Sequence, residues 1–531
     1  MNPLDNADYV ALLTGSVRLV LPEAALVGTA CALFLLAAFG VGRSLTFVVT
    51  LLGIGGAAAV ALLFPEQPLA AEQLSLAVID PSPAAAFVRW LALVSAAVFA
   101  FIGWADTRKE TAGEYFACLL VVIAGLSLVA RANDLVSLFL ALELISVPTY
   151  VLLYLPSRSA AGQEATMKYF MLSVLSSGVL LFGFSYLYGL TGSLNLPVIT
   201  GTLTAAAKTG TVSPMALVAM VLVIAGLGFR LAAVPFHFYA PDVYEGASTG
   251  VVGQLAFIPK VAGFVALARL LGLFHAPITE LPFDTARTLI PLTLWVIAAV
   301  SMCLGNLMAL LQDNLKRLFA YSGIAHGGYM LIGILVACSV PDARAAAPDR
   351  VVNTGMDSLL FYLVAYGLMT VGAVAILSHL SFGDKPVETV DDLAGLGRTH
   401  PIAAAALAVC FFSLIGLPLT AGFYGKFKLF FDAFAAPTDT PMKNLYRVLV
   451  VLGAVNAAVA AVYYLRVIGV LYLRSPLKPA EPTRGYPALV AGVACAVATL
   501  AIGVFPQPLM DAARKATTAP TAPVQAVADA Q

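Results

Sequence analysis

Charged residues are scarce in this chain of 531 residues, of which Asp, Glu, Lys and Arg make up 11%, against roughly 25% in soluble proteins. The 29 basic residues balance the 29 acidic ones, so the sequence has no basic footprint of the kind that binds nucleic acid. One soluble core would not grow to this length either. The composition therefore excludes an ordinary soluble protein and a nucleic-acid partner.

Clustered metal ligands and nucleotide motifs are also lacking. The cysteines are Cys31, Cys118, Cys303, Cys338, Cys410 and Cys495, and none belongs to a Cys-x-x-Cys pair. Iron–sulfur and zinc sites need clustered ligands, so these cysteines are interpreted as small buried hydrophobic residues. The chain has no Gly-x-Gly-x-x-Gly that opens a helix after a strand, and no Walker lysine motif. We expect the chain itself to bind no nucleotide, flavin or metal centre.

Long apolar runs, by contrast, recur from end to end, and 60% of the residues are hydrophobic. Runs of about 20 residues have the length that crosses a bilayer, which predicts an all-α integral membrane protein with about fourteen spans. The predicted spans cover 19–40, 44–64, 85–104, 113–131, 134–155, 163–190, 213–238, 243–272, 287–311, 314–339, 354–380, 400 to beyond 426, 445–473 and 486–506. No basic leader precedes the first run, so no cleaved signal peptide is expected.

Two spans contain a proline and a basic residue close together, and each is predicted to be a broken helix. Span seven has Arg230 and Pro235, and span twelve has Pro418 and Lys426. The two are five spans apart, which places their units in opposite orientations and indicates an inverted repeat. The predicted units are 1–105 (helices one to three), 106–273 (first five-helix repeat), 274–474 (second, inverted repeat), 475–510 (helix fourteen) and 511–531 (a disordered tail rich in Ala, Pro and Thr).

The stretch from Gly226 to Lys260 holds Arg230 and Lys260 deep inside apolar runs, whereas Asp242 and Glu245 are assigned to the loop between them. Charge in hydrocarbon is costly and usually faces an interior path that carries function. Proline in a membrane helix frees backbone groups that only protein or cavity water can satisfy. This pattern favours an ion route over an ordinary polar loop.

Glu143 lies in the middle of span five, in Leu-Ala-Leu-Glu-Leu-Ile. Burial favours the uncharged form of a carboxyl group, and a nearby cation opposes it. Arg230 lies at a matching depth and is the predicted partner. The alternative is a static ion pair that only joins two helices.

Lys260 and Lys426 are the predicted titrating lysines, because buried lysines accept and release protons readily. Lys428 lies about 200° around the helix from Lys426, so only one of the two is expected to face the interior, and we choose Lys426. His326, beside two glycines, is either a core histidine or a relay, and the residues do not decide between them.

Lys168 is equally open, since Glu164 lies one helical turn before it and a simple ion pair at a span end would explain both residues. Lys316 and Arg317 stand at a helix start and are interpreted as interfacial.

Five motifs, at 164–178, 188–193, 234–247, 314–322 and 416–427, resemble the antiporter-like membrane subunits of bacterial NADH–quinone oxidoreductase, respiratory complex I. The Tyr-Glu-Gly-Ala ending of the third motif is similar to the subunit N branch rather than to branches L and M. The resemblance covers nearly the whole chain.

The resemblance implies fourteen helices, inverted repeats of five helices and a mid-membrane axis of buried charge that moves protons when quinone is reduced elsewhere. By motif, Glu143 matches the family's fifth-helix glutamate, Lys260 the eighth-helix lysine and Lys426 the twelfth-helix lysine. Arg230 stands where the family has a lysine. Arginine does not deprotonate in proteins, so Arg230 is expected to act as a positive charge on Glu143 and not as a proton carrier.

The resemblance also implies partners: NADH, flavin, iron–sulfur clusters and quinone on other subunits, the antiporter-like subunit M, the small subunits J and K, and the lipid bilayer. The expected location is the bacterial inner membrane, with the N-terminus periplasmic on a weak bias of basic residues in the loops. Alternatives are an Mrp-type cation/proton antiporter, a related redox pump not driven by NADH, and a structural scaffold whose charges form static pairs.

Overall fold

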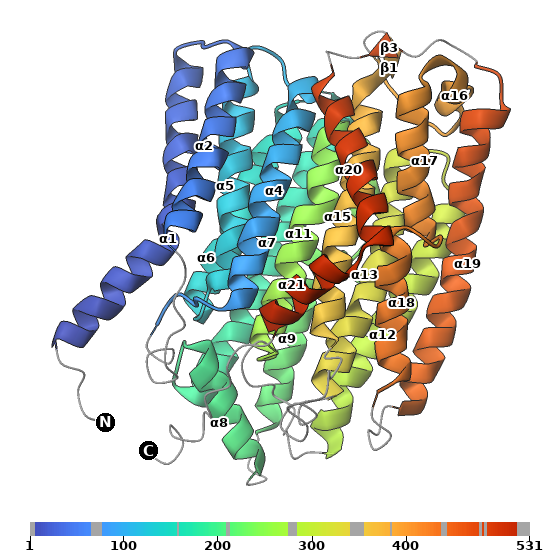
Figure 1. Cartoon of the computed structure of the whole chain (residues 1–531). Helices are drawn as coiled ribbons and strands as arrows, with labels where there is room; N and C mark the ends of the chain where they lie inside the picture. Colours follow the sequence, from blue (N-terminus) through green and yellow to red (C-terminus); the bar gives the residue numbers. More distant parts are fainter. Residues whose placement is uncertain are drawn as a thin grey trace.

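The computed structural model describes residues 6–64, 77–156, 159–208, 213–273, 284–339, 355–382, 385–436, 443–476, 481–482 and 486–517. It is a bundle of long helices that run side by side (Figure 1). Within the described residues, thirteen helices are long and apolar enough to cross a membrane. The broken pair α17 and α18 provides a further crossing, so the predicted all-α membrane fold with about fourteen spans is confirmed.

The crossing helices, in chain order, are α1 (Asn6–Ala38), α2 (Arg43–Leu63), α4 (Pro83–Asp106), α5 (Ala112–Arg131), α6 (Leu135–Tyr154), α7 (Ala160–Thr191), α9 (Pro214–Leu231), α11 (Thr249–Leu270), α12 (Asp284–Leu310), α13 (Leu315–Ser339), α15 (Met356–His379), the pair α17 (Pro401–Ile415) and α18 (Ala421–Phe434), α19 (Lys443–Leu473) and α20 (Pro487–Val504). Side-chain caps mark several starts: Ser82 caps α4 and Asp134 caps α6.

The two ends of the bundle are distinct. One end, the sheet face, carries a small antiparallel sheet in the order β2-β1-β3, with β1 (Leu380–Phe382) between β2 (Lys385–Pro386) and β3 (Glu481–Pro482). The short helices η1 (Asp391–Leu393) and α16 (Leu396–Thr399) lie between β2 and α17. The opposite end carries α8 (Leu196–Lys208), at the bottom of Figure 1.

Both predicted helix breaks are present. α9 ends at Leu231, where Ala232 takes a positive φ of 51°, and the chain resumes as the short helix α10 (Ala240–Gly246). α17 ends where Gly416 takes a φ of 93°, a conformation that suits glycine, and Thr420 then caps α18 with its side chain. Asp242 and Glu245, assigned to a loop from sequence, lie in α10.

The predicted disorder after Asp511 is wrong as far as Thr517. Residues Gln507–Thr517 form α21, which packs against α4 and α15. Met510, Ala513 and Ala516 are buried there, and burial of one face of an amphipathic helix stabilises it. The remainder of the predicted tail, 518–531, lies outside the described residues.

The centre of the bundle is formed by α11 and α13. Every residue of α11 is buried, and so is nearly all of α13. Helices that are apolar on all sides are expected in the interior, surrounded by other helices. These two carry Lys260 and His326, so the fold places both far from the lipid-facing surface.

Candidate functional site, an axis of buried charge

The first group of the axis is the ion pair between α6 and α9. Arg230 Nη2 lies 3.0 Å from Glu143 Oε1, and Arg230 Nη1 donates to Ser146 Oγ at 2.8 Å and to the Leu142 carbonyl at 3.2 Å. The Ser177 hydroxyl donates to Glu143 at 2.5 Å. The Arg230 side chain is 4% exposed and that of Glu143 24%. The predicted partnership is confirmed as a contact, and Glu143 also faces the outer surface of this chain.

Lys260 is fully buried on α11 and is held by backbone oxygens. Its Nζ donates to the Leu231 carbonyl at 3.1 Å and to the Gly323 carbonyl of α13 at 2.9 Å. Leu231 is the last residue of α9, so its carbonyl is one of those that a helix end leaves without an intrahelical donor. Lys260 thus caps the C-terminal end of α9, the first part of the broken span seven.

Lys426 has the same arrangement in the other half of the molecule. Its Nζ donates to the carbonyls of Leu414 and Ile415, at 2.8 and 3.0 Å, where α17 ends. It also lies 5.0 Å from the centre of the Tyr329 ring. The C-terminal end of a helix carries partial negative charge, and half-helix ends of this kind bind cations in membrane transporters. A helix end therefore takes the place of a carboxylate at each lysine.

His326 connects the surroundings of the two lysines along α13. Gly323, whose carbonyl accepts a hydrogen bond from Lys260, lies three residues before His326. Tyr329, whose ring faces the Lys426 ammonium, lies three residues after it. The His326 Nδ1 and the Tyr362 hydroxyl of α15 are 2.7 Å apart, and both lysines are close enough to act electrostatically on the imidazole. The geometry places His326 between the lysines, and its role as a relay or a core residue stays a prediction.

Lys428 corrects the expectation that only one lysine of α18 faces the interior. It is buried as Lys426 is, and it pairs with Asp432 at 2.5 Å. The Ser358 hydroxyl also donates to this carboxylate. Asp432 follows Lys428 by four residues, the spacing of helical ion pairs, and offsets its charge. The four-residue spacing of Lys428 and Asp432 is the sequence signal that predicts this pair.

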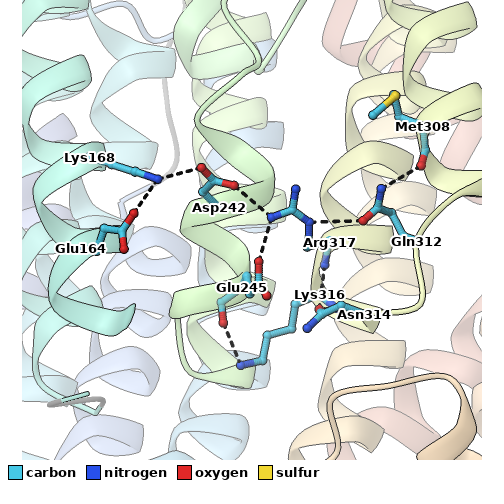
Figure 2. Close-up of polar contacts among 9 residues, drawn as sticks. All are labelled: Glu164, Lys168, Asp242, Glu245, Met308, Gln312, Asn314, Lys316 and Arg317. Atoms are coloured by element: carbon cyan, nitrogen blue, oxygen red, sulfur yellow. Dashed lines mark hydrogen bonds and ion pairs between the residues drawn. The ribbon is translucent and has the colours of Figure 1, made fainter. Parts of the chain in front are cut away.

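Lys168 belongs to an ion-pair network (Figure 2). The network lies near the sheet face, where the start of α13 pairs with the segment that follows β2. Lys168 pairs with Glu164 at 2.7 Å and with Asp242 of α10 at 2.8 Å, and its side chain is 39% exposed. Arg317 of α13 continues the network to Asp242 at 2.9 Å and to Glu245 at 2.7 Å. The network joins α7, α10 and α13, so the pair predicted between Lys168 and Glu164 is present within a larger cluster.

The network sets the charge state of Asp242 and the position of α10. Hydrogen bonding to the Lys168 ammonium, and then to Arg317, holds the pKa of the Asp242 carboxyl below its usual value. Lys316, interpreted from sequence as interfacial, is instead buried and donates to the carbonyls of Glu245 and Ala247.

Sequence reasoning missed two buried ion pairs close to the opposite face. Arg89 binds Glu23 at 2.8 Å, and Arg269 binds Asp80 at 2.6 Å. Single charges inside apolar runs were the available signal. Among the described residues, no group of three or more His, Cys, Asp or Glu side chains is placed to hold a metal ion.

Comparison with known proteins connects this geometry to a family. Residues 132–444 match the family described as "NADH:quinone oxidoreductase/Mrp antiporter, TM". The chain is 39% identical to "NADH-quinone oxidoreductase subunit N" of Anaeromyxobacter sp. (strain Fw109-5), over 85% of this chain and 87% of that one. It is 34% identical to the protein of the same description from Chlorobium chlorochromatii (strain CaD3), over 95% of each chain.

Solved structures agree with these relatives. A chain of respiratory complex I from Thermus thermophilus with bound aureothin superimposes with a TM-score of 0.73 at 33% identity, covering 92% of this chain and 98% of that one. A chain of the Mrp complex from Dietzia sp. DQ12-45-1b gives a TM-score of 0.74 at 18% identity, covering 96% of this chain and 99% of that one, which shows a shared fold.

Proposed function

The chain belongs to the NADH:quinone oxidoreductase/Mrp antiporter membrane family, and we propose that it moves protons along its buried charge axis as a subunit of NADH–quinone oxidoreductase. One observation carries the proposal: Lys260 and Lys426, both buried, donate to backbone oxygens, two of them at helix ends, and among the described residues neither has a carboxylate as a hydrogen-bond partner. A lysine bound in this way exists either as ammonium or as amine without leaving a buried carboxylate unmatched.

Each residue of the axis is assigned a role that fits its chemistry. Lys260 and Lys426 take up and release protons, and His326 lies between them to pass a proton or to transmit charge. Arg230 stays charged, because a guanidinium does not deprotonate in proteins, and it responds to the charge of Glu143 through their contact. A change in the charge of Glu143 therefore alters the electrostatic field at Lys260, because Lys260 binds the carbonyl of Leu231, the residue that follows Arg230.

The redox chemistry is assigned to other subunits. NADH, flavin, iron–sulfur clusters and quinone are expected there, and this chain contributes no redox step. Subunit M and the small subunits J and K are the proposed membrane neighbours. The proposed location is the bacterial inner membrane, with the N-terminus on the periplasmic side.

The test compares lysines inside and outside the axis. Lys260→Ala and Lys426→Ala are each expected to lower both quinone reduction and proton uptake in vesicles that hold equal amounts of assembled complex. Lys109→Ala, in an exposed turn, is the matched control and should behave as the parent. Normal activity and normal proton yield in both axis variants would refute the proposal.

An Mrp-type antiporter and a redox pump not driven by NADH would use the same charges. Purification with intact neighbours separates them: an NADH-reducible flavin in the same complex supports the proposal. Cation/proton exchange by a complex that has no such subunits would support the alternative.

A further inference from the structure

Each of the two helix breaks has a buried serine beside it whose hydroxyl oxygen accepts a backbone amide. The Ser413 hydroxyl of α17 accepts from the Gly422 amide of α18 at 3.0 Å. The Ser301 hydroxyl of α12 accepts, also at 3.0 Å, from the amide of Val234, three residues beyond the end of α9. Both serines are 0% exposed. A helix break deprives amide groups of their intrahelical acceptors, and in each break a serine supplies one.

Ser413 joins the two parts of the chain that hold Lys426. The carbonyls that accept from Lys426 belong to Leu414 and Ile415, the next two residues of α17. The amide that Ser413 accepts belongs to Gly422, which lies one helical turn before Lys426 on α18. One hydroxyl therefore fixes the helix that carries the ammonium group to the helix end that receives its hydrogen bonds.

α17 and α18 approach so closely at this contact that only glycine fits at position 422. A Cβ atom there would collide with the Ser413 carbonyl oxygen and would lie 2.8 Å from the Ser413 hydroxyl oxygen. The Ser413 hydroxyl donates to the Met369 sulfur of α15 at 3.4 Å. A thioether is a weak acceptor, so this bond orients the hydroxyl and leaves its oxygen available to the Gly422 amide.

Ser301 has the corresponding place at the break of α9, but it comes from another part of the chain. It belongs to α12, outside the first predicted repeat, and Val234 belongs to the segment between α9 and α10. Leu231, whose carbonyl accepts from Lys260, lies three residues before Val234. Ser301 therefore fixes the chain just beyond the acceptor of Lys260.

We propose that Ser413 and Ser301 are positioning residues for proton transfer at Lys426 and Lys260, respectively. The proposal rests on the proposed function. Hydrogen bonds weaken steeply when their distance or direction is wrong, and small misplacements of a reacting group slow a reaction strongly. Each serine keeps a helix end where its lysine finds the same carbonyl oxygens whenever it takes up a proton. The serine itself neither gains nor loses a proton in this role.

The first test removes the acceptor at position 413 and leaves Lys426 in place. In vesicles with equal amounts of assembled complex, we expect Ser413→Ala to slow quinone reduction coupled to pumping by about two- to tenfold, the effect of one lost hydrogen bond. The KM for quinone should stay unchanged, because quinone is expected to bind on other subunits. Ser413→Cys keeps nearly the same size but offers a weaker acceptor, so its rate should lie between those of Ser413→Ala and the parent. Ser301→Ala should behave as Ser413→Ala does.

Ser95→Ala on α4 is the matched control. Ser95 is also buried, and its hydroxyl donates to the Ala92 carbonyl of its own helix, a local bond that fixes no break. We expect this variant to turn over at the parent's rate. Hydrogen exchange followed by mass spectrometry adds a readout that does not depend on activity: the Gly422 amide should exchange faster in Ser413→Ala than in the parent, and unchanged exchange would contradict the inference.

A double variant separates positioning from general support of the fold. In Lys426→Ala the residual rate should be the same with and without Ser413→Ala, because the serine then has no lysine to position. A further fall in the double variant, or a parent-like rate in Ser413→Ala, would overturn the inference. If Lys426→Ala is impaired while Ser413→Ala is normal, only the positioning role is wrong. Normal activity in Lys426→Ala would refute the proposed function at this lysine, and the positioning role with it.

Discussion

Lys260 donates a hydrogen bond of 3.1 Å to the carbonyl oxygen of Leu231, the residue that directly follows Arg230. The ion pair of Glu143 and Arg230 and the buried lysine are thus joined through one peptide unit at the end of α9. When Glu143 changes its charge or its distance from Arg230, the oxygen that holds Lys260 belongs to the segment that must respond. Under the proposed function, this connection is the first step along the axis.

Arg230→Lys should be tolerated, with proton uptake per quinone reduced close to that of the parent. Lysine at this depth supplies the same positive charge to Glu143. Arg230→Ala should be harmful, because removal of one partner of a buried pair costs about 3–5 kcal/mol or leaves Glu143 neutral. Both are measured in vesicles with equal amounts of assembled complex. An inactive Arg230→Lys would mean that the planar guanidinium, with its bonds to Ser146 and Leu142, is needed for its geometry.

Lys428→Met should destabilise the protein by about 3–5 kcal/mol, because Asp432 would remain as a buried carboxylate without its cation. Adding Asp432→Asn removes that charge and keeps an oxygen for the Ser358 hydroxyl, so the double variant should unfold near the parent's temperature and pump normally. Thermal unfolding followed by tryptophan fluorescence, together with the pumping assay, checks this. Loss of pumping in a stable double variant would place Lys428 on the proton path beside Lys426.

Asp242 should contribute stability that depends on pH. Its carboxyl has a folded-state pKa below the ordinary 3.8, so the contribution is complete above about pH 4 and is lost as the pH falls through the lower folded value. Asp242→Asn should lower the unfolding temperature at neutral pH and remove this acid-dependent part. Because the Asp242 side chain is 42% exposed, the effect should not exceed about 1 kcal/mol. Glu110→Gln, in an exposed turn, is the control, and an equal change there would show a general charge effect.

His326→Phe distinguishes a relay from a core histidine. Phenylalanine keeps an aromatic ring against Tyr362 and Tyr366, whose rings lie 6.0 and 5.3 Å away, and removes both nitrogens. We expect proton uptake to fall while the unfolding temperature changes little. Tyr362→Phe, which removes only the partner of Nδ1, should have a smaller effect in the same direction. A variant that pumps normally but unfolds at a lower temperature would assign His326 to the core.

The spans and both helix breaks could be predicted because hydropathy and proline positions are local properties of the sequence. Pairing by depth also identified Glu143 and Arg230, since two opposite charges at one level of an apolar bundle attract each other strongly. The expectation that Lys428 faces away from the interior was wrong. The sequence does hold a local signal for its burial, because Asp432, its ion-pair partner, follows one helical turn later.

Other features had no local signal. Lys260 and Lys426 bind backbone carbonyls, which every residue has, so no residue type marks the acceptors. The contacts of Lys168 with Asp242 and of Arg317 with Asp242 depend on how α7, α10 and α13 pack. Helix α21 was hidden by its composition, because Ala and Thr are common in disordered tails as well as in short packed helices.

The helix ends that hold Lys260 and Lys426 have one more consequence. A helix C-terminus carries roughly half an elementary charge, whereas a carboxylate carries a whole one. A full negative charge beside the lysine would strongly favour its ammonium form, and purely apolar surroundings would favour its neutral amine. Half a charge favours the ammonium form less strongly than a carboxylate would, so, under the proposed function, a smaller change in the surrounding field is needed to shift the lysine between ammonium and amine. Under the proposed function, each helix break therefore tunes the protonation of its lysine with backbone carbonyls, which a side-chain substitution leaves in place.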